Sequence, residues 1–214
     1  MKQMKPNNGN FTRRRALQAG FSALTLGTLG IYGCSDTSGN GSAQISADLR
    51  ALLEPLLIGD IAAMAVRGEP DDVSDLVFNG PDGNTIAMSD TGGKFRLVNL
   101  WATWCAPCRK EMPALDELQK TRGDDRFEVI AISVDGGSLE KPRAFFDEIG
   151  LKSLKFYHDP TISVFNALKK KSLAFGLPAT LLLDKDNRVI ANMNGPAEWA
   201  GRDAYALIDA VKAL

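Results

Sequence analysis

The sequence predicts an α/β domain with a central mixed β-sheet flanked by helices, and three observations carry this prediction. Residues 95–100 and 127–134 are rich in apolar, β-favouring side chains, and the second run suits a strand buried on both faces. Residues 107–122 between them have the apolar spacing of a helix, so the three segments form a strand–helix–strand unit. Two further apolar runs, 181–183 and 188–193, flank a turn and predict a strand with its partner strand.

Shorter patterns predict the remaining elements of this core. Apolar residues at helical spacing indicate short helices over 142–149 and 161–170, and a closing amphipathic helix over 201–214. Residues 154–157 form a weak strand pattern between the first two of these helices. No internal repeat interrupts this order of elements.

An extension precedes the core. Apolar residues recur at nearly helical spacing over 47–68, which predicts an amphipathic helix that is broken or restarted at Pro55. This helix either packs on the domain or serves a partner. Residues 76–78 and 85–88 flank a turn-rich loop, and this arrangement predicts a β-hairpin.

The chain of 214 residues divides into three parts by composition. Residues 1–34 have the pattern of an export signal or membrane anchor. Residues 35–46 are rich in Gly and Ser, which is the composition of a flexible linker. We expect one folded domain over 47–214, in which 47–93 is the extension and 94–214 is the core.

The N-terminal pattern is a basic flank followed by a weakly apolar, uncharged run over 16–33. Paired arginines at Arg13–Arg15 suggest the twin-arginine export route. Three interpretations stay open: Cys34 carries lipid after cleavage, the run stays as a short membrane anchor, or the product is soluble and Cys34 is inert. A small residue before Cys34 suits a lipoprotein cleavage box, although Tyr32 fits that box poorly. The first two interpretations tether the domain at the periplasmic face of the bacterial inner membrane, in an oxidising compartment.

Charge and cysteine content exclude two classes of protein. Residues 1–33 hold five basic side chains and no acidic ones, so 34–214 has 20 basic side chains against 26 acidic ones. A domain with this balance lacks the basic surface that nucleic-acid binding requires. Three cysteines are too few for a disulfide-dense scaffold. We expect a monomer that binds other proteins and no nucleic acid.

The chemical centre of the sequence is Cys105-Ala106-Pro107-Cys108, which stands where a strand passes into a helix. Two cysteines at this spacing and in this place are typical of a redox-active dithiol. Free N–H groups and the helix dipole favour a thiolate at Cys105, which we predict to be the exposed nucleophile. Cys108, one helical turn further, is expected to be shielded and to resolve the mixed disulfide. Pro107 suits the first helical turn, and Trp104 is expected to form a partly exposed wall of the site.

The stretch WATWCAPCRKEMPALDEL, residues 101–118, resembles the TlpA-like thiol:disulfide oxidoreductases of the thioredoxin superfamily. Pro113 lies inside the helix at the offset of the kinking proline of that superfamily, and residues 195–200 also match the TlpA-like pattern. The resemblance gives Pro178, just before a strand, the role of the cis-proline that faces the active disulfide. The backbone of Leu177 would then dock an extended substrate.

This resemblance implies a thioredoxin fold with an N-terminal helix and β-hairpin extension, and a membrane-tethered periplasmic reductant. The implied clients are proteins that assemble copper in cytochrome oxidase, a Sco-type copper chaperone or the copper-bearing subunit. Alternatives are apocytochrome c before haem attachment, or a copper-binding chaperone-like module. A membrane thiol carrier would supply the electrons. No cofactor or metal is expected besides the redox-active disulfide Cys105–Cys108.

One departure from the thioredoxin pattern and the competing interpretations of the cysteine pair leave questions open. Thioredoxin has a buried aspartate six residues before its first cysteine, and this chain has Asn99 there, so the base for Cys108 is not identified. Glu111 lies three residues beyond Cys108, and we do not favour it. A structural disulfide or a metal site are the competing interpretations of the pair, but zinc wants four ligands and His158 is the only histidine. It lies in a turn-like sequence and is expected to be solvated. The dipeptide Ala106-Pro107 resembles that of thioredoxin and favours a reductant.

Overall fold

The computed structural model describes residues 45–214; the predictions for residues 1–34, including Cys34, and for 35–44 of the linker fall outside these residues. In the described part, eight strands form one mixed sheet in the order β1-β8-β7-β4-β5-β6-β2-β3. The helices and strands are α1 (Ala47–Leu53), η1 (Glu54–Leu56), η2 (Gly59–Ile61), β1 (Ala65–Asp72), β2 (Val77–Asn79), β3 (Thr85–Ala87), η3 (Met88–Thr91), β4 (Phe95–Trp101), α2 (Ala106–Arg122), β5 (Phe127–Ser133), α3 (Glu140–Glu148), β6 (Tyr157–His158), α4 (Ser163–Lys170), β7 (Ala179–Leu183), β8 (Arg188–Asn194) and α5 (Arg202–Lys212).

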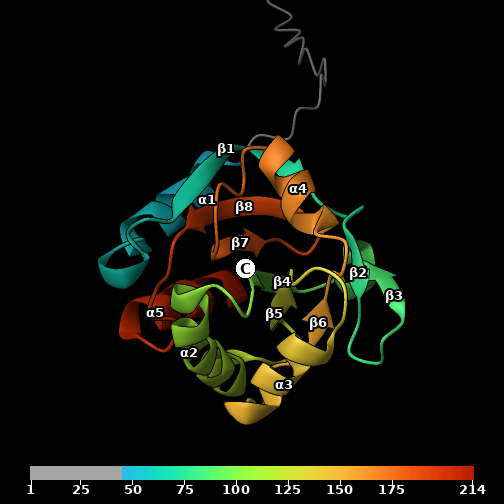
Figure 1. Cartoon of the computed structure of the whole chain (residues 1–214). Coiled ribbons are helices and arrows are strands. Elements are labelled where there is room, and N and C mark those ends of the chain that lie inside the picture. The colour runs from blue at the N-terminus through green and yellow to red at the C-terminus, as the bar shows by residue number, and fades with distance from the viewer. Residues whose placement is uncertain (1–44) are drawn as a thin grey trace, which may run out of the picture. The chain divides into compact units, whose positions relative to one another are not determined.

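The centre of the sheet is β4, which pairs in parallel with β5 and antiparallel with β7. Every residue of β4 and β5 is buried, because helices cover both faces of the sheet at this point. Helices α2, α3 and α5 lie on one side of the sheet and α4 lies on the other (Figure 1). The predicted α/β class, a mixed sheet flanked by helices, is confirmed.

The extension differs from the prediction of one helix over 47–68. Helix α1 ends at Leu53, a 3₁₀ turn contains Pro55, and 65–72 is the edge strand β1, which pairs antiparallel with β8. The apolar residues of 47–61 do form helical turns on the core, where Leu53 and Ile61 are wholly buried. Beyond them the backbone is extended, because hydrogen bonds to β8 outweigh local helical spacing.

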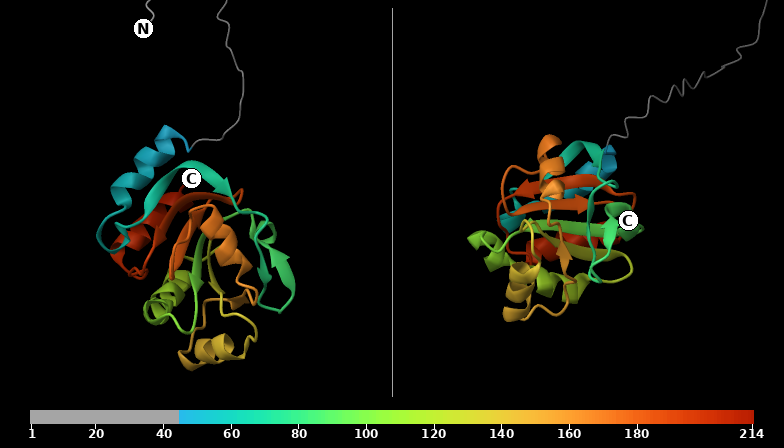
Figure 2. Two further views of the ribbon diagram at one scale, coloured as in Figure 1. Left: turned by 45° about the horizontal axis from the view of Figure 1, so that its top comes forward. Right: turned by 45° about the vertical axis from the view of Figure 1, so that its right-hand side comes forward.

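The predicted hairpin is present as β2 and β3, and it forms one edge of the sheet. Asn79 of β2 pairs with His158 of β6, so the hairpin continues the sheet instead of standing apart from it. Figure 2 shows this hairpin at the opposite edge of the sheet from β1. The predicted strand over 154–157 is shorter and later than expected, since β6 comprises only Tyr157 and His158.

Register places four connecting segments together at one end of the sheet. Trp101, the last residue of β4, lies opposite Ser133 of β5, and Ser133 lies opposite His158 of β6. On the other side of β4, Leu100 lies opposite Ala179, the first residue of β7. The segments that follow Trp101, Ser133 and His158, and the segment that precedes Ala179, therefore meet at this end. Within residues 45–214 no helix has both the length and the apolar character needed to cross a membrane.

Candidate active site

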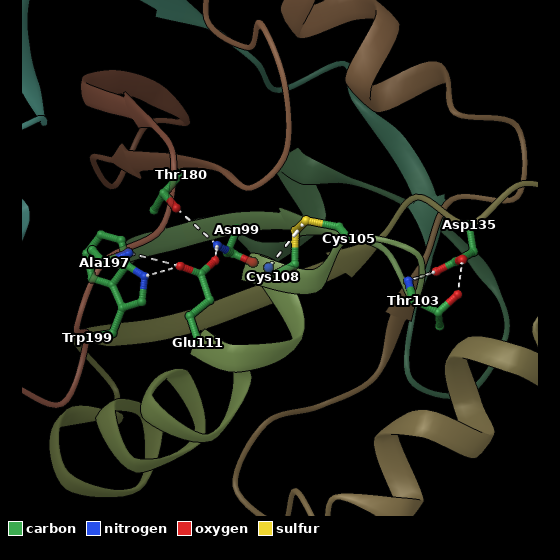
Figure 3. Close-up of a disulfide and its surroundings, with 9 residues drawn as sticks. All are labelled: Asn99, Thr103, Cys105, Cys108, Glu111, Asp135, Thr180, Ala197 and Trp199. Carbon is green, nitrogen blue, oxygen red and sulfur yellow. Dashed lines mark hydrogen bonds between the residues drawn. A yellow bond between two sulfur atoms is a disulfide. The ribbon is translucent and has the colours of Figure 1, made fainter.

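A disulfide joins Cys105 and Cys108 at the start of α2, with an S–S distance of 2.02 Å. Cys105 is the residue that caps the helix, and its sulfur accepts the backbone N–H of Cys108 at an N···S distance of 3.3 Å. The helix thus places N–H groups and its positive dipole end beside the first sulfur, which favours an anion there. Figure 3 shows the disulfide and the polar groups around it.

The two cysteines differ in accessibility. Cys105 is 5% exposed and Cys108 is fully buried, so an incoming group can reach only the first sulfur. Cys105 is less exposed than the sequence led us to expect, because the helix start and the preceding turn cover it. The neighbouring Trp104 is 71% exposed and contributes an apolar surface next to the disulfide, while Ala106 and Pro107 form the exposed first turn of α2.

The turn before Cys105 is fixed by Asp135, which follows β5. Its carboxylate accepts the backbone N–H of Thr103 at 2.9 Å and the hydroxyl of Thr103 at 2.6 Å. The hydroxyl of Ser133 donates to the same carboxylate at 2.9 Å. These bonds tie the segment that carries the nucleophile to the end of a central strand, which limits the positions that Cys105 can take.

The peptide bond between Leu177 and Pro178 is cis. Ala179 pairs with Leu100, so Pro178 lies at the end of β4 from which the segment leading to Cys105 departs. Leu177 is half-buried and packs against the core. The docking role of Leu177 and Pro178 stays a prediction.

Behind Cys108 lies a buried carboxylate, which the sequence analysis did not favour. Glu111 is on α2, and its Oε1 accepts the side-chain N–H of Asn99 at 2.8 Å. Its Oε2 accepts the backbone N–H of Ala197 at 3.2 Å and the indole N–H of Trp199 at 3.3 Å. Burial raises the pKa of Glu111 from 4.5 to about 7, against the opposite effect of these hydrogen bonds.

The helical spacing was a usable signal for this residue. Residues three apart lie on the same face of a helix, so Glu111 shares the inward face with Cys108. That face is otherwise apolar, with Met112, Leu115 and Leu118 all buried. A glutamate among them indicates a buried carboxylate, and distance in sequence from Cys108 is no argument against it.

Glu111 also borders a groove of about 470 Å³ on the surface. The groove lies between the extension, the first turns of α2 and the segment between β8 and α5. Its lining residues are Asp60, Ala106, Pro107, Lys110, Glu111, Pro196, Ala197 and Glu198. A carboxylate that is buried among protein groups yet reaches this groove has a route for exchanging protons with solvent.

His158 is buried, contrary to the expectation of a solvated histidine. It belongs to β6, and its Nε2 donates to the backbone oxygen of Asp135 at 2.8 Å. This bond holds the segment after β5 in place. Among residues 45–214, no group of three or more His, Cys, Asp or Glu side chains gathers so as to hold a metal ion.

The mixed sheet, the CxxC disulfide at a helix start and the cis-proline define a thioredoxin-like protein with a dithiol site. A profile of the Redoxin family matches residues 69–208, which is more than half of the chain, and the chain belongs to this family. The resemblance to TlpA-like proteins of the thioredoxin superfamily is thereby confirmed.

Individual relatives agree with this assignment. Thiol-disulfide oxidoreductase ResA of Bacillus cereus is 32% identical over 120 residues, which cover 53% of this chain and 62% of ResA. Thioredoxin-like protein YneN of Bacillus subtilis is 42% identical over 71 residues, which cover 32% of this chain and 41% of YneN. The matches thus span less than two thirds of these relatives. The crystal structure of a DsbF homologue from Corynebacterium diphtheriae, 26% identical, superposes with a TM-score of 0.54 and covers 71% of this chain and 93% of that one.

Proposed function

We propose that the protein is a thiol:disulfide oxidoreductase that reduces disulfide bonds in other proteins through Cys105 and Cys108. The observation that carries the proposal is the disulfide at the start of α2, in which Cys105 is 5% exposed and Cys108 is fully buried. A structural disulfide has no need of this asymmetry. The similarity to ResA, a thiol-disulfide oxidoreductase by name, supports the same activity.

The reaction begins from the reduced dithiol. The thiolate of Cys105 attacks one sulfur of a client disulfide, and the other client sulfur leaves as a thiolate and takes a proton from water. The resulting mixed disulfide joins Cys105 to the client. Cys108 loses its proton and attacks the sulfur of Cys105, which releases the second client thiol and closes the Cys105–Cys108 disulfide. Two electrons have then passed from the dithiol to the client.

Glu111 is the group we assign to accept the proton of Cys108. Its pKa of about 7 lets the carboxylate take up a proton near neutral pH, and the groove returns that proton to solvent. We expect Glu111→Gln to slow the second step by roughly a hundredfold, a typical contribution of a general base. Attack by Cys105 should be affected much less.

In the cell, we propose that residues 1–34 tether the domain at the periplasmic face of the inner membrane, where a membrane thiol carrier restores the dithiol. The basic flank and apolar run of the N-terminus support this location. The clients would be a Sco-type copper chaperone or the copper subunit of cytochrome oxidase, and the alternative is apocytochrome c before haem attachment. We propose that the protein acts on them as a monomer.

Trapping tests the reaction and the client together. Cys108→Ser leaves the first step intact and blocks the second, so a client should stay bound to Cys105 in cells. Non-reducing electrophoresis and peptide mapping would identify the linked protein. A control with both Cys105→Ser and Cys108→Ser keeps Cys34, so a partner that persists there is held by Cys34. Absence of any partner that depends on Cys105 would refute the exchange reaction.

A further inference from the structure

Asn99 has a buried amide oxygen without a hydrogen-bond partner. The residue lies on the central strand β4 and is fully buried. Its two amide N–H groups are both used, one toward Oε1 of Glu111 at 2.8 Å and one toward the hydroxyl of Thr180 at 3.0 Å. Its oxygen Oδ1 bonds to nothing. Buried acceptors are rarely left in this way, because the loss of a partner destabilises the fold.

The position of this oxygen identifies the missing partner. The amide nitrogen faces Glu111 and Thr180, so the oxygen lies on the opposite side of the planar group. Cys108 lies one turn before Glu111 on the same face of α2, and Figure 3 shows the oxygen of Asn99 on the side of Cys108. In the disulfide, Cys108 has no hydrogen to donate. In the reduced protein its S–H group is the donor that this oxygen lacks.

We propose that the side-chain amide of Asn99 couples the protonation of Cys108 to that of Glu111 by turning over between two orientations. In the orientation of the structure, Oδ1 accepts the S–H of Cys108, and the N–H groups bind the carboxylate of Glu111 and the hydroxyl of Thr180. After a half-turn about its last bond, the amide presents N–H to the thiolate of Cys108 and its oxygen to the carboxylic acid of Glu111. The hydroxyl of Thr180 serves both orientations, because it accepts in the first and donates in the second.

The exchange balances in atoms and charge. One proton leaves the sulfur of Cys108 and ends on Oε1 of Glu111, so the negative charge passes from the carboxylate to the sulfur. Oε2 of Glu111 keeps its bonds from Ala197 and Trp199 throughout. Oδ1 of Asn99 and Oε1 of Glu111 therefore have a partner in both orientations, and the thiolate forms next to an N–H donor. The inference rests on the proposed function and names the device that prepares its second step.

Three further charged groups lie on the open side of the site. Asp60 of η2, Lys110 of α2 and Glu198, between β8 and α5, line the groove that borders Glu111. All three are exposed, so solvent screens their effect on the proton transfer. On the buried side, the residues that the structure places in hydrogen bonds with the amide are Glu111 and Thr180.

The test separates the two steps with a chromogenic aromatic disulfide, whose first thiol is released by Cys105 and whose second is released by Cys108. Asn99→Leu removes the amide and keeps a side chain of the same branching, although its methyl groups are bulkier than the amide. We expect the rate of the second thiol release to fall by about tenfold, because the thiolate loses one stabilising N–H donor. The rate of the first release should change by less than about twofold. Equal slowing of both steps, or an unchanged second step, would overturn the proposal. If the first release is absent even in the wild type, the proposed function itself fails.

A second pair of variants covers the case in which Asn99→Leu does not fold. Thr180→Val removes the hydroxyl that must switch between acceptor and donor, and Thr180→Ser keeps it. Both replacements fit a buried position on β7. We expect Thr180→Val to slow only the second release and Thr180→Ser to leave both rates at the wild-type values. Identical second-release rates in these two variants would overturn the proposal.

Discussion

The buried carboxylate of Glu111 makes a measurable prediction about stability against pH. Burial raises its pKa from 4.5 to about 7, and the bonds from Asn99, Ala197 and Trp199 only partly offset this effect. Below pH 4.5 the residue is protonated in both the folded and the unfolded chain, and the folded state has its full stability. Between pH 4.5 and about 7 the Glu111 carboxyl is ionised in the unfolded chain but stays protonated in the folded protein. Stability is therefore lost as pH rises through this window.

The size of the effect follows from the two pKa values. At 1.36 kcal/mol per pH unit, the difference corresponds to a loss of about 3 kcal/mol by neutral pH. Glu111→Gln removes the ionisation and should remove this part of the pH dependence, whatever its effect on stability at low pH. Urea unfolding of the oxidised protein at a series of pH values, followed by tryptophan emission, measures both curves.

A matched control lies on the same helix. Glu117 is a partly exposed glutamate of α2 whose carboxylate contacts Lys120, and Glu117→Gln should leave the curve parallel to that of the wild type. The free energy of unfolding of Glu111→Gln, taken relative to that of the wild type, should increase by about 3 kcal/mol between pH 4.5 and 7.5. Parallel curves for Glu111→Gln and wild type would refute the raised pKa and, with it, the choice of Glu111 as the proton acceptor.

Three further substitutions probe the supports of the site. Oδ1 of Asp116 accepts the backbone N–H groups of residues 152–154, so Asp116→Ala should lower the free energy of unfolding by about 1–3 kcal/mol in urea, whereas Asp116→Asn keeps the oxygen. Asp135→Ala removes the acceptor that holds Thr103, so the turn that positions Cys105 is no longer fixed and alkylation of reduced Cys105 should slow. The thermal stability of the same variant is measured alongside as the control. Trp104→Ala removes a largely exposed ring, so the free energy of unfolding should change by less than about 0.5 kcal/mol. The Trp104→Ala variant should reduce a protein disulfide more slowly than the wild type does, and its reduction of a small aromatic disulfide should slow less. Equal slowing with both substrates would contradict a role of Trp104 in client contact.

The core of the fold was predictable because its signals are local. The strand–helix–strand unit over 95–134 combines continuous apolar runs with helical spacing, and both signals lie within a few residues of each other. The CxxC pair marks the junction by its residue types alone. The edge strand 65–72 was not predictable in this way, because it exists through its pairing with 188–192, far along the chain.

The polar residues of the site escaped prediction for a related reason. Whether Glu111 is buried depends on Asn99, Ala197 and Trp199, which reach it only through the tertiary fold. His158 was expected in solvent because its neighbours in sequence suggest a turn, yet β5 and β2 pair on either side of it. Burial of a polar group is a property of its spatial neighbours, and sequence spacing constrains these weakly outside regular elements.

The placement of the acid on α2 instead of on β4 has a chemical consequence. A carboxylate at position 99 would be fully enclosed between the sheet and α2, with no surface through which to lose a proton. At position 111 the carboxylate borders a groove, and its two oxygens are held by donors from two separate segments, β4 and the connection between β8 and α5. The amide of Asn99 is left to face the sulfur, where it can serve either the thiol or the thiolate. The site thus assigns proton exchange with solvent to one residue and hydrogen bonding to the sulfur to another, which a single buried acid could not separate.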